Sequence, residues 1–247
     1  MEEEVMELAQ PLVVSHPPQN YSTPKSYAFF IDVETSGPKT NDNFLIQVAM
    51  IFVSLDCKHV ISKYSFFLPA SVQDGKEWNT ETEAFWKSNR MRNKYDKAML
   101  GMSKQPFTPA HLFGRLIEWM EDKYAQNSNI YLMSDNPAFD IQWIQYHFPK
   151  NKSINMLSGY YSHIVDIRSW TIGLAREAFI SIPHGCSYGI AEKNLSHPYA
   201  YYSQLSGYVH DHDALNDTMG LYDTVIILLE KLKMQFIPVY SSFPIAY

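Results

Sequence analysis

Four acidic residues and one histidine are the side chains of this sequence best suited to chemistry: Asp32, Glu34, Asp140, His212 and Asp217. Carboxylates that a fold brings together repel one another, so such a cluster requires a cation. Hard divalent ions such as Mg²⁺ and Mn²⁺ prefer oxygen ligands, and a nearby histidine supplies a base. The set therefore indicates a site that holds two divalent ions and hydrolyses phosphodiesters.

The first two acids lie at the end of a predicted strand. Residues 27–33 (YAFFIDV) form a short apolar run, which is typical of a strand buried on both faces. Because the side chains of a strand alternate, Asp32 and Glu34 point to the same face and can bind one ion. Three small residues follow: Thr35, Ser36 and Gly37. They allow the backbone to approach a ligand closely, although a plain polar turn explains them about as well.

Asp140 lies in the opening turns of a predicted helix. Residues 129–134 (NIYLMS) are predicted as a strand, after which Asn136 suits a helix N-cap and Pro137 the first helical position. Three apolar residues can anchor this helix on the sheet: Phe139, Trp143 and Ile144. Taken alone, Asp140 is explained more simply as a charge that interacts with the helix dipole.

Asp217 lies inside another predicted helix, over residues 213 to about 233. The small residues Ala214 and Gly220 let this helix lie close to the sheet and bring the carboxylate within reach of a metal ion. One of two acids is expected to cap it: Asp211 or Asp213.

The base is one of two histidines in the loop before that helix. His210 competes with His212 for the role, and the spacing to Asp217 favours His212. Without the other motifs, a histidine in such a loop is usually a surface residue.

The remaining elements follow from the spacing of apolar residues. Further strands are expected over residues 44–55, 59–68 and 163–167, and the first two form an antiparallel meander with residues 27–33. Further helices are expected over residues 80–99, 109–125 and 169–179.

The composition is that of one globular domain. The chain has 247 residues, of which 46% are apolar and 15% aromatic, and a second domain of useful size would not fit. Residues 1–25 begin acidic and continue rich in Pro, Ser and Asn, which predicts a flexible tail. We therefore expect the domain over residues 26–235. An aromatic C-terminal extension, residues 236–247, would pack on the domain or on a partner.

Charge and cysteine content exclude several classes of protein. The formal net charge of −6 argues against a protein that coats long nucleic acid, but it leaves room for a narrow substrate cleft. The acidic N-terminus lacks the order of a signal peptide, and no apolar run reaches membrane-spanning length. We therefore expect a soluble intracellular protein, cytoplasmic or nuclear. Two cysteines, Cys57 and Cys186, are too few for a zinc site or a disulfide framework.

The three acidic segments, in this order, resemble the DEDDh family of 3′-to-5′ exonucleases. The family pattern of Asp-x-Glu, then Asp, then His-x-Ala-x-x-Asp is matched by Asp32 and Glu34, by Asp140, and by His212, Ala214 and Asp217. The match extends over about residues 27–230. The ordered combination is far more specific than any single motif.

A closer resemblance is to the phage exonuclease A and bacterial exoribonuclease group. Residues 83–89 (EAFWKSN) are similar to a Trp-centred helix of that group, and residues 165–168 (VDIR) to its Asp-Ile-Arg segment. Asn89 departs from the usual Gln, and Trp86 is either a core anchor or a stacking surface. Gln47 stands where many members carry Glu, so no nucleotide-binding role is transferred to it.

The resemblance implies a ribonuclease H-like α/β fold, with a mixed five-stranded sheet flanked by helices. It implies that two Mg²⁺ or Mn²⁺ ions bind to the four acids Asp32, Glu34, Asp140 and Asp217. His212 would take the proton from the attacking water. The expected activity is a 3′-to-5′ exonuclease that releases nucleoside 5′-monophosphates from single-stranded ends or short oligonucleotides, with a slight preference for RNA over DNA. Members are often dimers, so both a monomer and a homodimer stay open.

Additional substrate contacts are expected close to these residues, from Thr35, Ser36, Phe139, Arg90 and Arg92. The two arginines belong to a basic segment, residues 87–104, which has six basic residues and one acid. Such a segment is a candidate surface for tracking phosphates, and a solvated helix face explains it about as well.

Two other functions stay open. A ribonuclease H-like endonuclease uses a similar set of carboxylates, but it does not require the His-x-Ala-x-x-Asp arrangement. A catalytically inactive nucleic-acid-binding or scaffold protein of the same fold is the second alternative. Inactive members of a family have usually lost metal-binding residues, however, and here the four acids and the histidine are all present.

Overall fold

The computed structural model describes residues 25–125, 129–148, 160–161, 163–170 and 206–231. Four predicted features lie outside these residues: nearly all of the N-terminal tail, the C-terminal extension, Cys186, and the predicted helix beyond residue 170. Cys57 is exposed. Among the described helices, none combines the length and the apolar character that crossing a bilayer requires.

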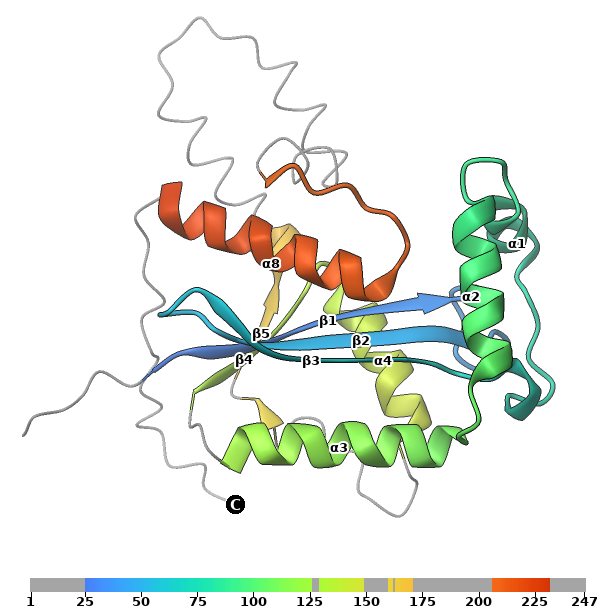
Figure 1. The fold of residues 1–247 in the computed structure, drawn as a ribbon, viewed down its shortest axis with the longest axis horizontal. Coiled ribbons are helices and arrows are strands. Elements are labelled where there is room, and N and C mark those ends of the chain that lie inside the picture. Colours follow the sequence, from blue (N-terminus) through green and yellow to red (C-terminus); the bar gives the residue numbers. More distant parts are fainter. Residues whose placement is uncertain (1–24, 126–128, 149–159, 162, 171–205, 232–247) are drawn as a thin grey trace, which may run out of the picture.

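Five strands form one mixed sheet in the order β3-β2-β1-β4-β5 (Figure 1). The predicted antiparallel meander is confirmed as β1 (Tyr27–Thr35), β2 (Leu45–Ser54) and β3 (His59–Phe67). On the other side of β1, β4 (Ile130–Ser134) and β5 (His163–Asp166) extend the sheet and run parallel to β1. The carboxyl ends of β1 and β4 therefore lie at the same edge of the sheet.

Helices cover both faces of this sheet (Figure 1). α8 (Ala214–Lys231) lies on one face, and α3 (Pro109–Ala125) and α4 (Pro137–His147) lie on the other. Beside the carboxyl end of β1, two further helices pack, α1 (Thr80–Trp86) and α2 (Arg92–Lys104). A one-turn 3₁₀ helix, Ala70–Val72, precedes them. The predicted fold class, a mixed sheet flanked by helices, is confirmed.

The single helix predicted over residues 80–99 is wrong. The chain forms two helices there, α1 and α2, and a turn over residues 87–91 separates them. In that turn the N–H of Ser88 donates to the carbonyl of Phe85, and the N–H of Met91 donates to the carbonyl of Ser88. Ser and Asn side chains compete with helical hydrogen bonds, so Ser88 and Asn89 favour the break.

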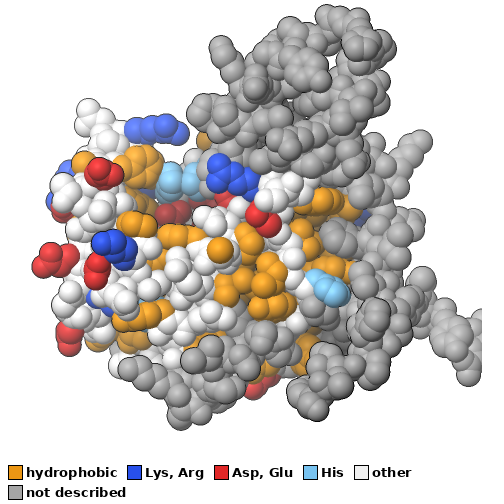
Figure 2. All heavy atoms as spheres, turned by 180° about the vertical axis from the view of Figure 1, so that it is seen from behind, with side chains coloured by type: hydrophobic (Ala, Val, Ile, Leu, Met, Phe, Trp, Pro, Cys, Tyr) orange, Lys and Arg blue, Asp and Glu red, His pale blue; other side chains and the backbone are white. Residues whose placement is uncertain are grey.

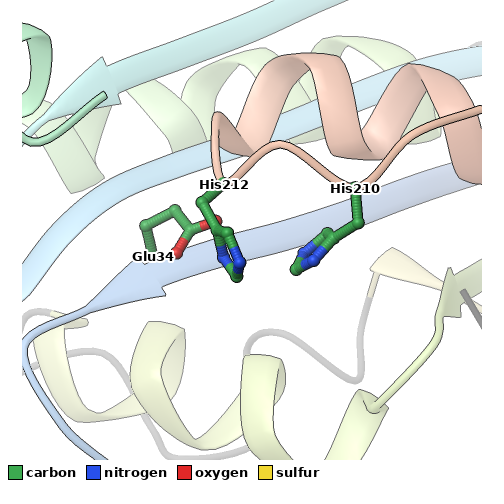
Figure 3. Close-up of side chains that lie close together, drawn as sticks. All are labelled: Glu34, His210 and His212. Atoms are coloured by element: carbon green, nitrogen blue, oxygen red, sulfur yellow. The ribbon is translucent and has the colours of Figure 1, made fainter. Parts of the chain in front are cut away.

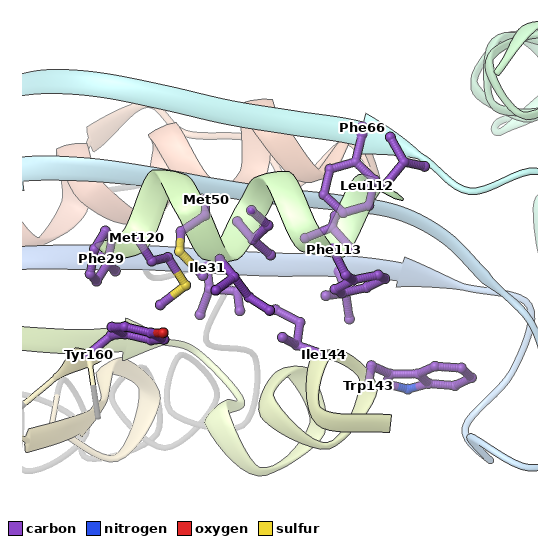
Figure 4. Packing of buried hydrophobic residues seen from close by; sticks show 14 of the residues in the cluster. Phe29, Ile31, Met50, Phe66, Leu112, Phe113, Met120, Trp143, Ile144 and Tyr160 are labelled. Atoms are coloured by element: carbon purple, nitrogen blue, oxygen red, sulfur yellow. The ribbon is translucent and has the colours of Figure 1, made fainter. Parts of the chain in front are cut away.

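The larger part of the core lies between the sheet and the helices α3 and α4 (Figure 4). Phe29 and Ile31 of β1 point into it, and no part of either side chain is exposed. Trp143 and Ile144 anchor α4 there, as predicted from the sequence, and Phe139 packs against the same cluster. This packing fixes the helix that carries Asp140.

The opposite face of β1 packs against α8. Ala28 and Phe30 lie in a second cluster with Val225 of α8. Asp32 and Glu34 follow Phe30 at intervals of two residues, so the alternation of the strand directs both carboxylates toward the face that α8 covers.

A third cluster joins α1 and α2 to the start of β2. Phe44 and Ile46 pack there against Trp86 and Met102. Trp86 is only 2% exposed, so it is a core anchor rather than a stacking surface. The cluster holds α1 and α2 beside the end of β1, next to the acidic residues.

Candidate active site

Three of the predicted acids come together between β1 and α8. One carboxylate oxygen from each of Asp32, Glu34 and Asp217 lies within 4.8 Å of the other two. All three side chains are buried, and Asp217 is only 1% exposed. The strand supplies the first two from a single face, and the first turn of α8 supplies the third.

A second group of carboxylates shares Asp32. Oxygens of Asp32, Asp135 and Asp140 also lie within 4.8 Å of one another. Asp140 is in the first turn of α4, as predicted, and its Oδ2 accepts a hydrogen bond from the hydroxyl of Ser134. Sequence reasoning missed Asp135. Its position directly after β4, a strand parallel to β1, was the signal that could have found it.

His212 lies beside Glu34, with its Nδ1 3.6 Å from the Oε1 of that carboxylate (Figure 3). The ring of Phe85 meets the imidazole edge-on, with the two centroids 4.9 Å apart, and the ring of Trp86 lies 6.0 Å away. The backbone of His212 has a φ of 59°, in the left-handed region that side chains other than Gly seldom adopt. The surrounding structure must hold this conformation in place.

His210 also belongs to the site. Its Nε2 lies 3.2 Å from Oδ2 of Asp217, and its ring centroid is 4.0 Å from that of His212. Burial, together with the neighbouring His212, lowers the pKa of His210 to about 3. The spacing to Asp217 favours His212, but the structure places both histidines next to the carboxylates.

Asp217 holds the histidine loop with one oxygen. Its Oδ1 accepts hydrogen bonds from the hydroxyl of Tyr208 at 2.8 Å and from the N–H of Asp211 at 3.0 Å. Gly220, one turn further along α8, lies directly under the Tyr208 ring, because a Cβ at that position would lie 1.9 Å from Cδ2. The glycine therefore allows Tyr208 to reach Asp217.

Further contacts fix the loop where it enters α8. The carboxylate of Asp213 accepts a hydrogen bond from the N–H of Asn216 at 3.4 Å, so Asp213 caps the helix as one of the two predicted candidates. Lys94 and Lys97 of α2 form ion pairs with Asp211 and Asp213, respectively. These pairs connect α2 to both sides of His212.

Burial and mutual repulsion raise the pKa values of the clustered acids. For Asp32, burial raises the pKa well above its ordinary value, and the charge of Glu34 adds to the effect. Burial likewise raises the pKa of Asp140 well above its ordinary value and that of Asp217 to about 7. It also raises the pKa of Glu34, although a hydrogen bond with His212 opposes the change. A bound cation would relieve this repulsion.

The donor atoms fit divalent cations. Among the described residues, Oδ2 of Asp32 and Oδ2 of Asp217 are buried without a hydrogen bond, although Nε2 of His210 lies 3.2 Å from the latter. Both aspartates belong to the groups of carboxylates whose oxygens lie within 4.8 Å of one another. Buried carboxylate oxygens without a hydrogen bond are suited to Mg²⁺ or Mn²⁺, which take oxygen ligands.

The residues expected to contact substrate near β1 have partners within the protein. The hydroxyl of Thr35 donates to the carbonyl of Gly37, and the hydroxyl of Ser36 donates to the carbonyl of Glu77. A Cβ at Gly37 would lie 2.4 Å from Oδ1 of Asn43, so this glycine makes room for a neighbouring side chain. These three residues lie next to the candidate site, as predicted. Their contacts within the protein explain why small residues occur there without requiring a bound ligand.

The basic segment, residues 87–104, is largely paired with acids. Lys87 pairs with Glu83, and Arg92 pairs with Asp96 at 3.5 Å through exposed side chains. Exposed pairs of this kind contribute little, so Arg92 remains available to a ligand. Arg90 is exposed, and its charge contributes to the lowered pKa of His210. One end of the segment therefore lies close to the site.

The surface view shows how the site opens to solvent. Figure 2 shows histidine and acidic side chains gathered in a hollow of this face, with lysine or arginine side chains next to them. The side chains of His210 and His212 are 20% and 22% exposed, respectively, whereas the carboxylates beneath them are buried. A phosphate group approaching this hollow would meet histidine and basic side chains first.

No sequence-family model matches the chain, and no curated protein sequence does. Solved structures of nucleases match its fold. Exonuclease I from Methylocaldum szegediense gives a TM-score of 0.58 at 16% identity, over 84% of this chain and 41% of that one. E. coli exonuclease I in complex with a dA16 oligonucleotide gives 0.55 at 16% identity, over 83% and 41%. The nuclease domain of 3′hExo, a DEDDh family member bound to rAMP, gives 0.50 at 12% identity, over 84% and 93%.

The similarity covers the fold of this chain but only part of the length of several of the similar proteins. This chain spans 41% of the exonuclease I chains and 65% of cell-death related nuclease 4. The chain therefore shares the fold of these nucleases, and its mixed five-stranded sheet flanked by helices is the predicted fold class.

Proposed function

We propose that the chain is a divalent-metal-dependent 3′-to-5′ exonuclease of the DEDDh type. It would release nucleoside 5′-monophosphates from single-stranded ends or short oligonucleotides, with RNA slightly preferred over DNA. The observation that carries the proposal is the convergence of buried carboxylates from β1, α4 and α8 beside His212. Among structures of the same fold, one is bound to rAMP and another to a dA16 oligonucleotide, which supports a nucleotide ligand.

The two overlapping carboxylate groups would hold two Mg²⁺ or Mn²⁺ ions. Asp32, Glu34 and Asp217 would bind one ion, and Asp32 with Asp140 would help to bind the second. Asp135 is an additional candidate ligand for the second ion. When bound, such ions make water more acidic and neutralise charge on both sides of the phosphorus atom.

His212 would accept the proton of the attacking water. Its imidazole is partly exposed, so water can reach it, and the edge of the Phe85 ring limits its rotation. The carboxylates cannot take this role while they serve as metal ligands. His212→Ala would therefore lower kcat and largely spare metal binding.

Substrate would reach the site along the basic end of α1 and α2. Arg90 and Arg92 are exposed and would contact phosphates of the strand, and Phe139 and Thr35 lie on the elements that carry the acids. Charge reversal at Arg90 and Arg92 would raise KM and weaken its dependence on salt. An unchanged KM and salt dependence would remove both arginines from the substrate site.

The proposal is tested with end-labelled RNA and DNA oligonucleotides, offered with Mg²⁺ or with EDTA. Wild type should shorten the strands from their 3′ ends and release 5′-monophosphates only with Mg²⁺. Asp140→Asn should lose this activity, whereas the matched control Asp223→Asn, an exposed position on α8, should keep it. Metal-independent cleavage that survives Asp140→Asn would end the proposal. Cleavage of a circular strand would indicate an endonuclease instead, and inactive wild type would indicate a binding protein.

A further inference from the structure

The second histidine of the loop, His210, completes a further ligand set together with two residues of the proposed exonuclease site. One donor atom from each of Glu34, His210 and His212 lies within 4.8 Å of the other two. Figure 3 shows the two imidazoles side by side beneath the loop that leads into α8, with Glu34 next to His212. This group shares Glu34 with the carboxylate site, but it offers two nitrogens in place of oxygens.

Two imidazoles and one carboxylate select a different class of metal. Mg²⁺ prefers an octahedron of oxygens, whereas Zn²⁺ binds histidine nitrogen readily and commonly takes three protein ligands plus water. Zn–N and Zn–O bonds of about 2.0–2.1 Å place tetrahedral donor atoms roughly 3.3 Å apart. The 3.6 Å between Nδ1 of His212 and Oε1 of Glu34 is close to that spacing.

The site is both accessible and built on fixed elements. The two histidine side chains are about one fifth exposed, so an ion can enter from solvent. The loop between them is held by the bond from the N–H of Asp211 to Asp217 and by the ion pair of Lys94 with Asp211. A preorganised set of donors loses less freedom on binding an ion than a flexible one would.

We propose that Glu34, His210 and His212 form a Zn²⁺ site, and that Zn²⁺ bound there switches the enzyme off. The binding itself does not depend on the proposed function, whereas the inhibition rests on it. Zn²⁺ would occupy the lone pair with which His212 accepts the proton of water. It would also draw Glu34 away from the Mg²⁺ ligands, so excess Mg²⁺ would relieve the inhibition only partly.

Zn²⁺ affinity is measured with a chromophoric chelator as competitor, in a large excess of Mg²⁺ that saturates the oxygen site. Wild type should bind one Zn²⁺ per chain. His210→Gln removes a metal ligand, so it should weaken this binding by more than the roughly tenfold to hundredfold that loss of a residue orienting a ligand costs. The control His111→Gln, a histidine on α3 that stacks on Phe107, should bind Zn²⁺ as wild type does. Equal affinity in wild type and His210→Gln would overturn the proposal.

A second measurement needs no variant. Co²⁺ added to wild type in the presence of Mg²⁺ should give the intense visible absorption of a nitrogen-containing site of low coordination number. The weak spectrum of a six-coordinate oxygen site would overturn the proposal even where His210→Gln fails to fold.

The inhibition is scored as the ratio of activity with and without Zn²⁺ for each variant. A wild type that binds Zn²⁺ but never cleaves nucleic acid would refute the proposed function and leave the metal site standing. A wild type that cleaves, binds no Zn²⁺ in excess Mg²⁺ and keeps its activity would refute only the metal site. The two failures are therefore distinguishable.

Discussion

The side-chain oxygen of Gln47 in β2 accepts a hydrogen bond from the backbone N–H of Ala214, the first residue of α8, across 3.2 Å. The bond is buried, and Nε2 of the same amide lies 3.3 Å from the hydroxyl of Ser65, which fixes its orientation. Ala214 lies two residues after His212. Gln47 therefore ties the histidine loop to the sheet, although it touches no reacting group.

Replacing Gln47 tests this positioning role. Gln47→Leu leaves the N–H of Ala214 without its acceptor, so His212 should lose its fixed position and kcat should fall by about tenfold or more. Gln47→Glu keeps an acceptor oxygen and should retain more activity than Gln47→Leu. Steady-state kinetics on folded variants gives the answer, and equal kcat values for the two variants would contradict the role.

The ion pairs of α2 with the loop give a second prediction. Joint replacement of Lys94 and Lys97 by Met removes the pairs with Asp211 and Asp213, so the loop should open more often. Hydrogen exchange of the backbone amides at residues 211–214 should accelerate by about tenfold, and kcat should fall.

A matched control exists at the far end of α8, where Lys58 pairs with Glu230 at 3.0 Å. Lys58→Met also removes one lysine pair to α8, but it lies away from the loop. Exchange at residues 211–214 should stay as in wild type for this variant. If the double variant also left exchange unchanged, the ion pairs would not hold the loop.

Two glycine substitutions should have opposite effects on stability. Gly220→Ala forces a methyl group against the Tyr208 ring, so it should lower the free energy of unfolding by about 2 kcal/mol. It should also weaken Mn²⁺ binding, because Tyr208 donates to Asp217. Gly114→Ala in α3 meets no atom within 4 Å and should raise stability by about 0.5–1 kcal/mol. Urea unfolding of both variants tests this, and a stabilised Gly220→Ala would refute the contact.

The raised pKa values predict an unusual pH dependence for metal-free protein. The pKa of Asp217 is raised from 3.8 to about 7, so its contribution to stability is complete below about pH 4 and is lost as the pH rises through 7. Asp32, Glu34 and Asp140 shift in the same direction. In EDTA, the melting temperature should therefore fall between weakly acidic and weakly alkaline pH.

Mg²⁺ should reverse this fall, since it binds the ionised carboxylates. Asp217→Asn should melt higher than wild type in EDTA at alkaline pH and gain less from Mg²⁺, because the amide oxygen can still accept the bonds from Tyr208 and Asp211. Thermal melts over a pH series provide the measurement. A wild type that grows steadily more stable toward alkaline pH in EDTA would contradict the repulsion.

Local sequence signals were sufficient for much of the fold. The apolar run of β1 is uninterrupted, so its extent and the shared face of Asp32 and Glu34 follow from strand periodicity alone. The break between α1 and α2 was missed although Ser88 and Asn89 favour it, because long-range packing also fixes where α1 ends. Trp86, the last residue of α1, lies in one cluster with Phe44, a residue more than forty positions earlier in the chain.

Sequence motifs marked the candidate acids and His212, whereas residues that join the site only through the folding of distant segments were missed. Gln47 and Tyr208 contact α8 through hydrogen bonds that the local sequence does not predict. The choice of His212 over His210 rested on spacing, whereas in the structure both rings lie beside carboxylates, with their centroids 4.0 Å apart. Asp135 became visible only when β4 was placed parallel to β1.

The central claim is that the acids gathered between β1, α4 and α8 bind a pair of divalent ions. Electron paramagnetic resonance of free Mn²⁺ counts the ions bound per chain, in the presence of a saturating nucleoside 5′-monophosphate. We expect two Mn²⁺ per wild-type chain and loss of both in Asp32→Asn, because Asp32 belongs to both carboxylate groups. Wild type that binds no Mn²⁺, or Asp32→Asn that binds as many ions as wild type, would contradict it.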